Sequence, residues 1–325
     1  MQNKNILIIG GAGFLGGNLV RRLLYKNKIA VLVKPNTDLW RIKDIKSHKN
    51  LEIIKDNLSN REILQKILED KDYLFHFAWQ TDLKKSMENP LWDLQEDLGG
   101  LINILEICKK NENIKNKIKI IFTSTVTVIG ESSKLPSNET EAENPLSVYD
   151  INKLVAEKYL QVYYKNYNIK SCILRLSNVF GEYQKIDNPN RGVLNFMIGK
   201  ALRNEPLTVY GDGNWIRDYC YVQNYIDAFI LAAESEKTNG EVYVLGFGVG
   251  KSFNEAVEKI KEVTKDLTGK NINVEHVSFP KNEHKINKRN FIADFSKFKR
   301  DTGWVPKISF DEGIKKTIGF YVNPS

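Results

Sequence analysis

Short apolar runs alternate with longer amphipathic segments through the first half of the chain. The apolar runs predict strands, and the segments whose apolar residues recur every three or four positions predict helices. The predicted strands are 6–9, 29–33, 51–54, 73–77, 118–123 and 171–176. The predicted helices are 14–26, 61–69, 91–110 and 149–167. Because strands that alternate with helices form crossover units, this half predicts a parallel sheet covered on both faces.

The second half of the chain has a less regular pattern. Residues 191–203 predict a helix, another helix is predicted to end near residue 234, and 241–245 predict a strand. No Pro- or Ser-rich linker separates the halves, so a second domain would be interleaved with the first. We therefore expect an α/β fold, a Rossmann-type doubly wound parallel sheet with a smaller, interleaved C-terminal domain. The expected sheet domain is 1–178 with a return segment near 218–250, and the expected second domain is 179–217 and 251–325.

Composition narrows the classes of protein that fit this pattern. No apolar run reaches membrane-spanning length, and the segment before the first strand is too short for a signal peptide. The cysteines, Cys108, Cys172 and Cys220, lack metal-ligand spacing, so we expect no metal site and a reducing, cytoplasmic location. The net charge is +8, but acids are interspersed with the basic residues, even in the basic cluster 281–289. We therefore expect a solvated surface that attracts small phosphates, with neither nucleic acid nor a membrane as partner.

Glycines at positions 10, 13 and 16 follow the first predicted strand and precede the first predicted helix. A turn of this kind lets the backbone approach a diphosphate, and the N–H groups at the helix N-terminus face that charge. Glycine-rich turns are common, but the strand–turn–helix context favours a dinucleotide site.

Lys34 directly follows the second predicted strand, 29–33, where a dinucleotide-binding strand usually ends in an acid that meets the adenosine ribose. Lys34 and the polar residues after it could receive a 2′-phosphate instead, or Lys34 could be an ordinary surface lysine. Charge alone therefore leans toward NADP, and the choice between NAD and NADP stays open.

Tyr149 and Lys153 lie four residues apart in a predicted helix and so share one face. A neighbouring ammonium favours the phenolate and lowers the pKa of a tyrosine, which suits that tyrosine to act as a base. The hydroxyl-rich segment 122–130, FTSTVTVIG, would lie at the carboxyl end of a strand, where α/β sheets bind ligands. Its hydroxyls could bond a substrate oxygen, or its threonines could simply suit a strand end.

Taken in order, a set of motifs resembles a known family. The motifs are GGAGFLG, DYLFHFAWQ, SMENPLWDLQEDLGGLINILE, STVTVIG, YDINKLVAEKY, LRLSNVFG, PLTVYGDGNWIRDYCYV and DTGWVPKISFDEGIKKT. Spread over nearly the whole chain, they resemble the extended short-chain dehydrogenases/reductases, the NAD-dependent epimerase/dehydratase family. The resemblance implies an NAD(P)-dependent enzyme acting on a nucleotide-diphosphate sugar, with 179–217 and 251–325 as the sugar-nucleotide-binding domain.

Carried over by position, the resemblance implies roles for single residues. Tyr149 matches the catalytic base, Lys153 the partner that also holds the nicotinamide ribose, and Thr125 the hydroxyl that bonds the reacting sugar oxygen. The implied cofactor-binding residues are Gly10, Gly13, Phe14, Leu15, Gly16, Lys34, Asn57, Leu58, Phe77, Ala78, Ser124, Tyr149 and Lys153. The implied substrate-binding residues are Thr125, Asn178, Asn195, Arg217 and Arg289, of which Asn178 and Arg217 fall where the family holds the diphosphate.

The resemblance further implies a homodimer formed through helices 91–110 and 149–167, although their apolar faces could equally be buried in one chain.

We interpret His76 as a packed strand histidine, because no metal ligands surround it in the sequence. Four sites depart from the family pattern: Asn57 replaces an aspartate that meets the adenine, Asp97 an asparagine, Ile129 a tyrosine, and Gln223 with Asn224 an acidic pair.

The residues after Thr125 bear on the reaction. Dehydratases of this family usually carry Asp-Glu there, and decarboxylases need a similar carboxylate, whereas this chain has Val126 and Thr127. The resemblance therefore favours a nucleotide-sugar epimerase with a keto-sugar intermediate, expected at C4, in the biosynthesis of surface-glycan sugars. A 4-ketoreductase or 4-dehydrogenase running one half-reaction is the alternative, and a non-catalytic NAD(P)-binding protein is a third.

Overall fold

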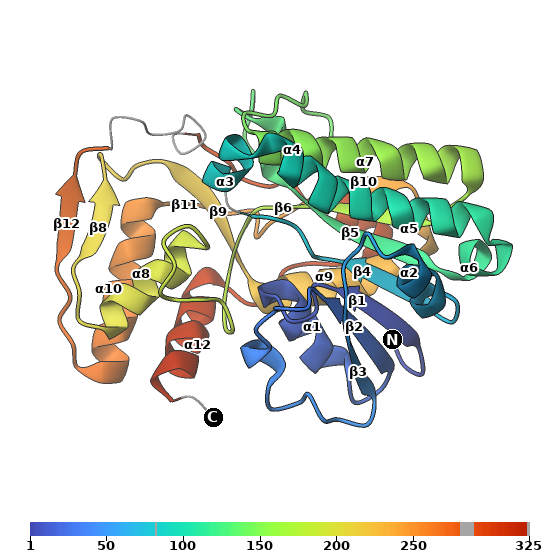
Figure 1. The fold of residues 1–325 in the computed structure, drawn as a ribbon. Helices are drawn as coiled ribbons and strands as arrows, with labels where there is room; N and C mark the ends of the chain where they lie inside the picture. The colour runs from blue at the N-terminus through green and yellow to red at the C-terminus, as the bar shows by residue number, and fades with distance from the viewer. Residues whose placement is uncertain (82, 280–288, 324–325) are drawn as a thin grey trace.

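The central sheet of the protein has seven parallel strands in the order β3-β2-β1-β4-β5-β6-β10 (Figure 1). The structure is a computed structural model that describes residues 1–81, 83–279 and 289–323. From β1 the chain adds β2 and β3 on one side of the sheet, and then β4, β5 and β6 on the other side. The direction of strand addition therefore reverses between the neighbours β1 and β4, and doubly wound sheets bind ligands in the crevice at such a point. The strands are β1 (Asn5–Ile9), β2 (Lys28–Val33), β3 (Leu51–Lys55), β4 (Tyr73–His76), β5 (Lys119–Thr125), β6 (Ser171–Leu176) and β10 (Glu241–Leu245).

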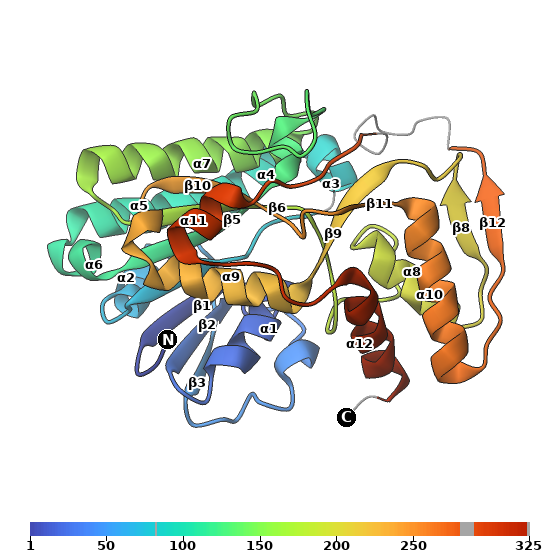
Figure 2. The same cartoon turned by 180° about the vertical axis from the view of Figure 1, so that it is seen from behind.

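Helices cover both faces of this sheet because its central strands are apolar on both sides. Ile6 and Ile8 pack with the helices of one face, and Leu7 and Ile9 with those of the other. In Figure 1, α5 and α7 run side by side across one face, and Figure 2 shows α1 and α9 on the opposite face. The first face carries α2 (Arg61–Leu68), α5 (Gly99–Lys110), α6 (Glu112–Lys117) and α7 (Val148–Tyr167), and the second α1 (Phe14–Leu23) and α9 (Val222–Glu234). The predicted Rossmann-type fold is thus confirmed.

The predicted helix 91–110 is wrong as a single element. The structure divides it into α4 (Pro90–Asp93), a π-helical turn η2 (Leu94–Leu98) and α5, after the short α3 (Leu83–Glu88). At the start of α5, a Cβ on Gly100 would lie 2.6 Å from the side chain of Leu58, so only glycine permits this close packing. The wider π-helical turn comes directly before this contact, and hydrophobic periodicity alone does not show such a turn.

The C-terminal region builds two smaller sheets beside the central one. β7 (Asn178–Phe180), β9 (Ile216–Tyr221) and β11 (Gly250–Ser252) form a three-stranded sheet, and β8 (Leu207–Tyr210) pairs with β12 (Val274–Val277). One hydrophobic cluster runs from the central sheet into this region, so the two parts share a core. The remaining helices are α8 (Val193–Leu202), α10 (Phe253–Thr268), α11 (Ser296–Thr302) and α12 (Phe310–Val322), with single turns η1 (Trp40–Ile42), η3 (Val126–Ile129) and η4 (Glu236–Thr238).

The structure bears on the predictions about membrane spans, cysteines, domain boundaries and the basic cluster. Among the described residues, none of the helices combines the length and apolarity needed to cross a membrane. All three cysteines are buried and free. The expected domain boundaries stay a prediction, although β10 and α9 do return to the central sheet from the second half. In the basic cluster 281–289, all residues but Arg289 lie outside the described part of the chain.

Candidate active site

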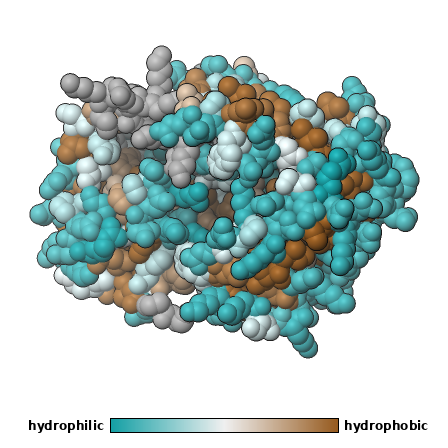
Figure 3. Space-filling model, viewed as in Figure 1, coloured by the Kyte–Doolittle hydropathy of each residue, from teal (hydrophilic) through white to brown (hydrophobic). Residues whose placement is uncertain are grey.

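A cavity of about 730 Å³ opens at the carboxyl ends of β1, β2, β3 and β4. We call it the main cavity. Figure 3 shows the surface hollowed near the centre of this face. Ten of the predicted cofactor-binding residues line the main cavity: Gly10, Gly13, Phe14, Leu15, Gly16, Lys34, Asn57, Leu58, Phe77 and Ala78. The structure therefore brings together in one wall residues that are up to 68 positions apart in the sequence.

The turn between β1 and α1 requires glycine. Gly10 has a φ of +81°, and a Cβ there would lie 2.7 Å from the backbone nitrogen of Ala78. A Cβ on Gly16 would lie 2.3 Å from the carbonyl oxygen of Gly10, so α1 packs directly onto the turn. The N-cap residue of α1 is Gly13, which has no side chain to accept from the first N–H groups. A cradle of this shape, with an open helix N-terminus, fits the diphosphate of a dinucleotide.

Glu96 supplies the carboxylate that the end of β2 lacks. Its Oε2 lies 2.6 Å from the Nζ of Lys34, and both residues line the main cavity. The ring of Trp92 lies 5.6 Å from the same ammonium. Sequence reasoning missed Glu96 because it comes 62 positions after Lys34, in the π-helical turn that the hydrophobic pattern did not predict.

Lys153 is held deep beside the main cavity. It is 3% exposed, and its ammonium donates to the carbonyl oxygen of Thr123 at 2.6 Å. The rings of Trp79 and Phe122 lie 4.0 and 4.6 Å from the same nitrogen. Tyr149 occupies the first turn of α7, one helical turn before Lys153. Neither residue lines the main cavity, but Trp79 does, and it links Lys153 to the cavity wall.

His76 is the packed strand histidine that the sequence predicts. It ends β4, is fully buried, and lies against the rings of Phe122 and Trp79. Burial lowers the pKa of His76 to about 3, with a smaller contribution from the charge of Lys153, so the ring is neutral.

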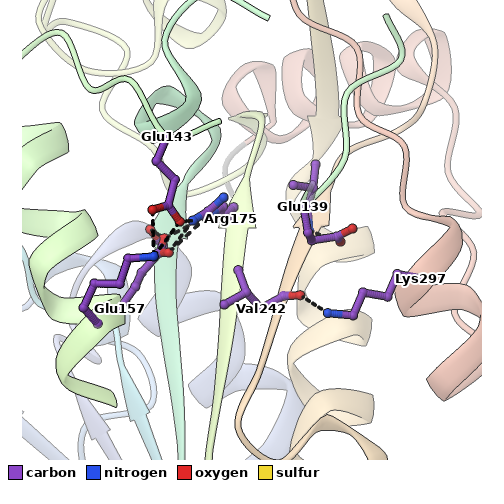
Figure 4. A network of polar contacts seen from close by, with 9 residues as sticks. Glu139, Glu143, Glu157, Arg175, Val242 and Lys297 are labelled. Atoms are coloured by element: carbon purple, nitrogen blue, oxygen red, sulfur yellow. Dashed lines mark hydrogen bonds and ion pairs between the residues drawn. The ribbon is translucent and has the colours of Figure 1, made fainter. Parts of the chain in front are cut away.

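Ser124 belongs to a buried ionic network that Figure 4 draws in part. Its hydroxyl donates to Glu157, and Glu157 accepts from Arg175 at 2.7 to 3.1 Å. Arg175 also pairs with Glu143 at 2.5 Å. Burial alone would lower the pKa of Arg175, but the hydrogen bonds and charges of the two glutamates raise it. The side chain of Ser124 therefore anchors the end of β5 to α7, and its nicotinamide contact stays a prediction.

Thr125 begins a hydrogen-bond chain. Its Oγ1 lies 2.8 Å from the Oγ1 of Thr127, whose hydroxyl donates to the Oδ1 of Asp150. The other oxygen of Asp150 accepts from Ser147, the N-cap residue of α7, at 2.7 Å. Asp150 is fully buried, and sequence reasoning missed it because a carboxylate in the first turn of a helix is common at the surface.

The two predicted substrate arginines lie together. Arg217 of β9 donates to the main-chain carbonyl of Arg289. Arg289 is 7% exposed, and its Nε and Nη1 have no hydrogen-bond partner among the described residues. Burial and the charge of Arg217 lower the pKa of Arg289 to about 10, while Asp150 acts in the opposite direction. A buried guanidinium with unused donors fits a bidentate anion such as a diphosphate.

The remaining predicted substrate residues lie in different surroundings. Asn178 lines the main cavity. Asn195 is fully buried, and its amide both donates to the carbonyl oxygen of Gly181 at 2.8 Å and accepts from its N–H at 3.2 Å. That side chain fastens α8 to the loop after β7, so a ligand contact from it would need these bonds to change, and its substrate role stays a prediction.

Known proteins resemble the chain over its whole length. A family model described as GDP-mannose 4,6 dehydratase matches residues 7–317. A putative UDP-glucose 4-epimerase of Methanocaldococcus jannaschii is 32% identical over 320 residues, 98% of each chain. The structure of a UDP-N-acetylglucosamine 4-epimerase from Methanobrevibacter ruminantium M1, in complex with UDP-N-acetylmuramic acid, matches with a TM-score of 0.89 and 30% identity over 100% of both chains. That of the UDP-glucuronic acid 4-epimerase from Bacillus cereus, in complex with UDP-glucuronic acid and NAD, matches with a TM-score of 0.83 and 26% identity over 99% of this chain and 100% of that one.

These matches agree with the glycine cradle, with the Tyr149–Lys153 spacing on α7 and with the strand order of the central sheet. The chain belongs to the GDP-mannose 4,6-dehydratase family of extended short-chain dehydrogenases/reductases.

Proposed function

We propose that the protein is an NAD-dependent UDP-sugar 4-epimerase that works through a 4-keto sugar. The observation that carries this proposal is the combination of Thr125 at the end of β5 with Tyr149 and Lys153 on α7, and with no carboxylate at positions 126 and 127. Loss of the C6 hydroxyl in a dehydratase needs an acid and a base beside Thr125, and Val126 and Thr127 offer neither. The 4-epimerases among the structural neighbours support the same choice.

The proposed chemistry follows from the groups around the site. Oxidised nicotinamide, when bound, supplies a hydride acceptor. Tyr149 takes the proton of the sugar hydroxyl, helped by the positive charge of Lys153. Thr125 bonds the reacting oxygen. After the ketone has turned over, the hydride would return to its other face and the proton to that oxygen. Nothing is consumed in such a cycle, which is what separates an epimerase from an enzyme that runs one half-reaction.

Arg217 and Arg289 are proposed to hold the diphosphate of the substrate. Arg289 is the stronger candidate, because two of its N–H groups are buried and without a partner in the described part of the chain. An anion of two charges would satisfy those groups and offset the repulsion between the two guanidinium groups. The UDP-sugars bound in the neighbours make UDP the proposed nucleotide.

NAD is proposed over NADP. Lys34, whose charge favours NADP in the sequence, is already paired with Glu96 in the cavity wall. A 2′-phosphate near Lys34 would meet the carboxylate of Glu96, whereas a ribose hydroxyl could donate to it. The neighbours solved with NAD point the same way.

Turnover of UDP-glucose, UDP-N-acetylglucosamine and UDP-glucuronic acid by the purified protein tests the proposal. We expect conversion of at least one of them to its 4-epimer, followed by proton NMR, without net change in the absorbance of reduced nicotinamide. Steady oxidation of NADPH would favour the ketoreductase, and steady accumulation of NADH the dehydrogenase. Tyr149→Phe should lower turnover by about 100-fold or more while the cofactor stays bound. Full activity of that variant would reject the assignment of Tyr149.

A second copy of the chain is the proposed partner, bound at α4 and α7. Leu91, Trp92, Ile151 and Val162 are 64, 46, 47 and 49% exposed there, and Figure 3 shows the apolar surface over α4. Sedimentation equilibrium of the wild type and of Val162→Asp tests the contact, and a monomeric wild type rejects it.

The three buried, free cysteines support the proposed cytoplasmic location. A nucleotide-sugar product would serve as a donor for surface glycans.

A further inference from the structure

Asp150 lies in the first turn of α7, three residues after the N-cap residue Ser147. Its carboxylate is fully buried, and its two oxygens have different partners. Ser147 bonds one oxygen at 2.7 Å and accepts from the Asp150 N–H at 3.2 Å, which completes the N-cap of α7. Thr127 donates to the other oxygen, across from α7 to η3. Helix capping explains the contacts with Ser147 but not the contact with Thr127.

The direction of each hydrogen bond follows from the protons available. A carboxylate can only accept, so Thr127 gives its single hydroxyl proton to Asp150. In its bond with Thr125, at 2.8 Å, Thr127 must then accept, and Thr125 donates. Having no proton left, the Oγ1 of Thr125 can only accept, as it does from the N–H of Thr127 at 3.2 Å. A sugar hydroxyl that reaches Thr125 would therefore donate to it.

We propose that Asp150, acting through Thr127 and Thr125, provides an alternative route for the single proton of the sugar hydroxyl, the other route being direct transfer to Tyr149. When the oxidising half-reaction takes this route, the hydroxyl proton moves to Thr125, that of Thr125 to Thr127, and that of Thr127 to Asp150. The electron pair of the sugar C–H bond leaves as hydride to the nicotinamide that the proposed function supplies, so a carbonyl forms. In the return half-reaction the same three protons move back, and Asp150 ends as it began.

The relay rests on the proposed function. It assigns Asp150 a role in proton transfer in addition to the structural role of stabilising the first turn of α7. Val126 and Thr127 put no carboxylate on the strand side of the site, and Asp150 provides one from the helix side. The two ends of the hydrogen-bond chain are buried, Asp150 at 0% and Thr125 at 9% exposure, and Thr127 between them is partly exposed. The chain of bonds ends at Thr125, the residue proposed to bond the reacting oxygen, and a carboxylate that only stabilised the helix would not require that end point.

Replacing Thr127 tests the relay without removing the helix cap. Thr127→Val breaks the chain, Thr127→Ser keeps the hydroxyl, and Ser147→Ala removes only the two cap bonds between Ser147 and Asp150. We expect Thr127→Val to lower turnover by roughly 10- to 100-fold with little change in KM, and Thr127→Ser to restore it. In mixtures of light and heavy water, a plot of wild-type turnover against the deuterium fraction should be curved, because several protons move. The same plot for Thr127→Val should be linear.

A second measurement needs no turnover. In the ligand-free protein, the infrared carboxylate stretch identified by its loss in Asp150→Asn should shift in Thr127→Val and not in Thr127→Ser. Wild-type turnover in Thr127→Val, a straight line for the wild type, or an unchanged stretch would overturn the relay while leaving the epimerase assignment intact. Failure of the wild type to convert any nucleotide sugar would reject the proposed function and the relay together.

Discussion

The ammonium of Lys153 lies 4.0 Å from the centre of the Trp79 ring and donates at the same time to the carbonyl oxygen of Thr123. Trp79 lines the main cavity and Lys153 does not. The charge that is proposed to activate Tyr149 is therefore in contact with an aromatic face and a carbonyl oxygen. Such partners stabilise an ammonium without neutralising it, so its field still acts on a neighbouring phenol.

Trp79→Ala should weaken this arrangement. The cation–π contact is worth about 0.5 to 2 kcal/mol, so we expect turnover to fall by roughly 2- to 30-fold. Trp79→Phe keeps an aromatic face and should recover most of the loss. Bound NAD, released and quantified from each purified variant, separates lost catalysis from lost cofactor. Unchanged turnover in Trp79→Ala would mean that Lys153 does not depend on the ring.

Glu96→Gln should shift the cofactor preference toward NADP. Without the carboxylate, Lys34 can pair with a 2′-phosphate, and the repulsion between that phosphate and Glu96 disappears. Both side chains are partly exposed, at 59 and 40%, so solvent limits the effect to roughly fivefold in the ratio of the two dissociation constants. Isothermal titration with each cofactor measures that ratio. Glu62→Gln, on exposed surface outside the main cavity, is the matched control, and equal ratios in both variants would contradict the role of Glu96.

Much of the fold could be predicted from the sequence because its sheet strands are buried on both faces. Ile6–Ile9 is a continuous apolar run, and Ser171–Leu176 is apolar or small except at Arg175, so their strands are found within a residue of their ends. The break at η2 could not be predicted from hydrophobic periodicity, and the close packing of Gly100 on Leu58 just after it joins segments 42 residues apart. The β8–β12 pair was missed for a similar reason, since its strands pair across more than sixty residues.

The site was predictable where chemistry requires a local spacing. The glycines of the first turn and the pair of Tyr149 and Lys153 are set by one turn and one helix face, and both can be read locally. Glu96 and Asp150 could not be found in this way. Neither acid belongs to a recognisable local motif. Only the fold brings Glu96 to Lys34 and Asp150 to Thr127.

Glu157→Gln should destabilise the protein strongly. Glu157 and Arg175 are 0 and 2% exposed, so the substitution leaves a buried guanidinium with less compensation and costs about 3 kcal/mol or more. Urea unfolding followed by circular dichroism measures the loss. Glu143→Gln is the control, because Glu143 bonds the same arginine from a site where its side chain is 26% exposed, and it should cost about 1 kcal/mol or less. Equal losses in the two variants would show that burial of the pair is not what matters.

Arg289→Met should stabilise the ligand-free protein and abolish its affinity for UDP. The wild-type guanidinium is buried beside Arg217, and its Nε and Nη1 have no partner among the described residues, so an apolar side chain of similar length removes a desolvation cost. A higher Tm without ligand, together with the loss of the Tm increase on adding UDP, is the expected pair of results. Arg300→Met, at a 69% exposed arginine, should change neither.

The pH dependence gives the same argument a second test, because only the protonated guanidinium holds the diphosphate. Since the pKa of Arg289 lies near 10, below its usual value, the KM for the nucleotide sugar should be constant at neutral pH and rise as the pH passes from 9 toward 10. A lower Tm in Arg289→Met would instead show that its buried charge is already compensated in the free protein, and the diphosphate would then have to bind elsewhere.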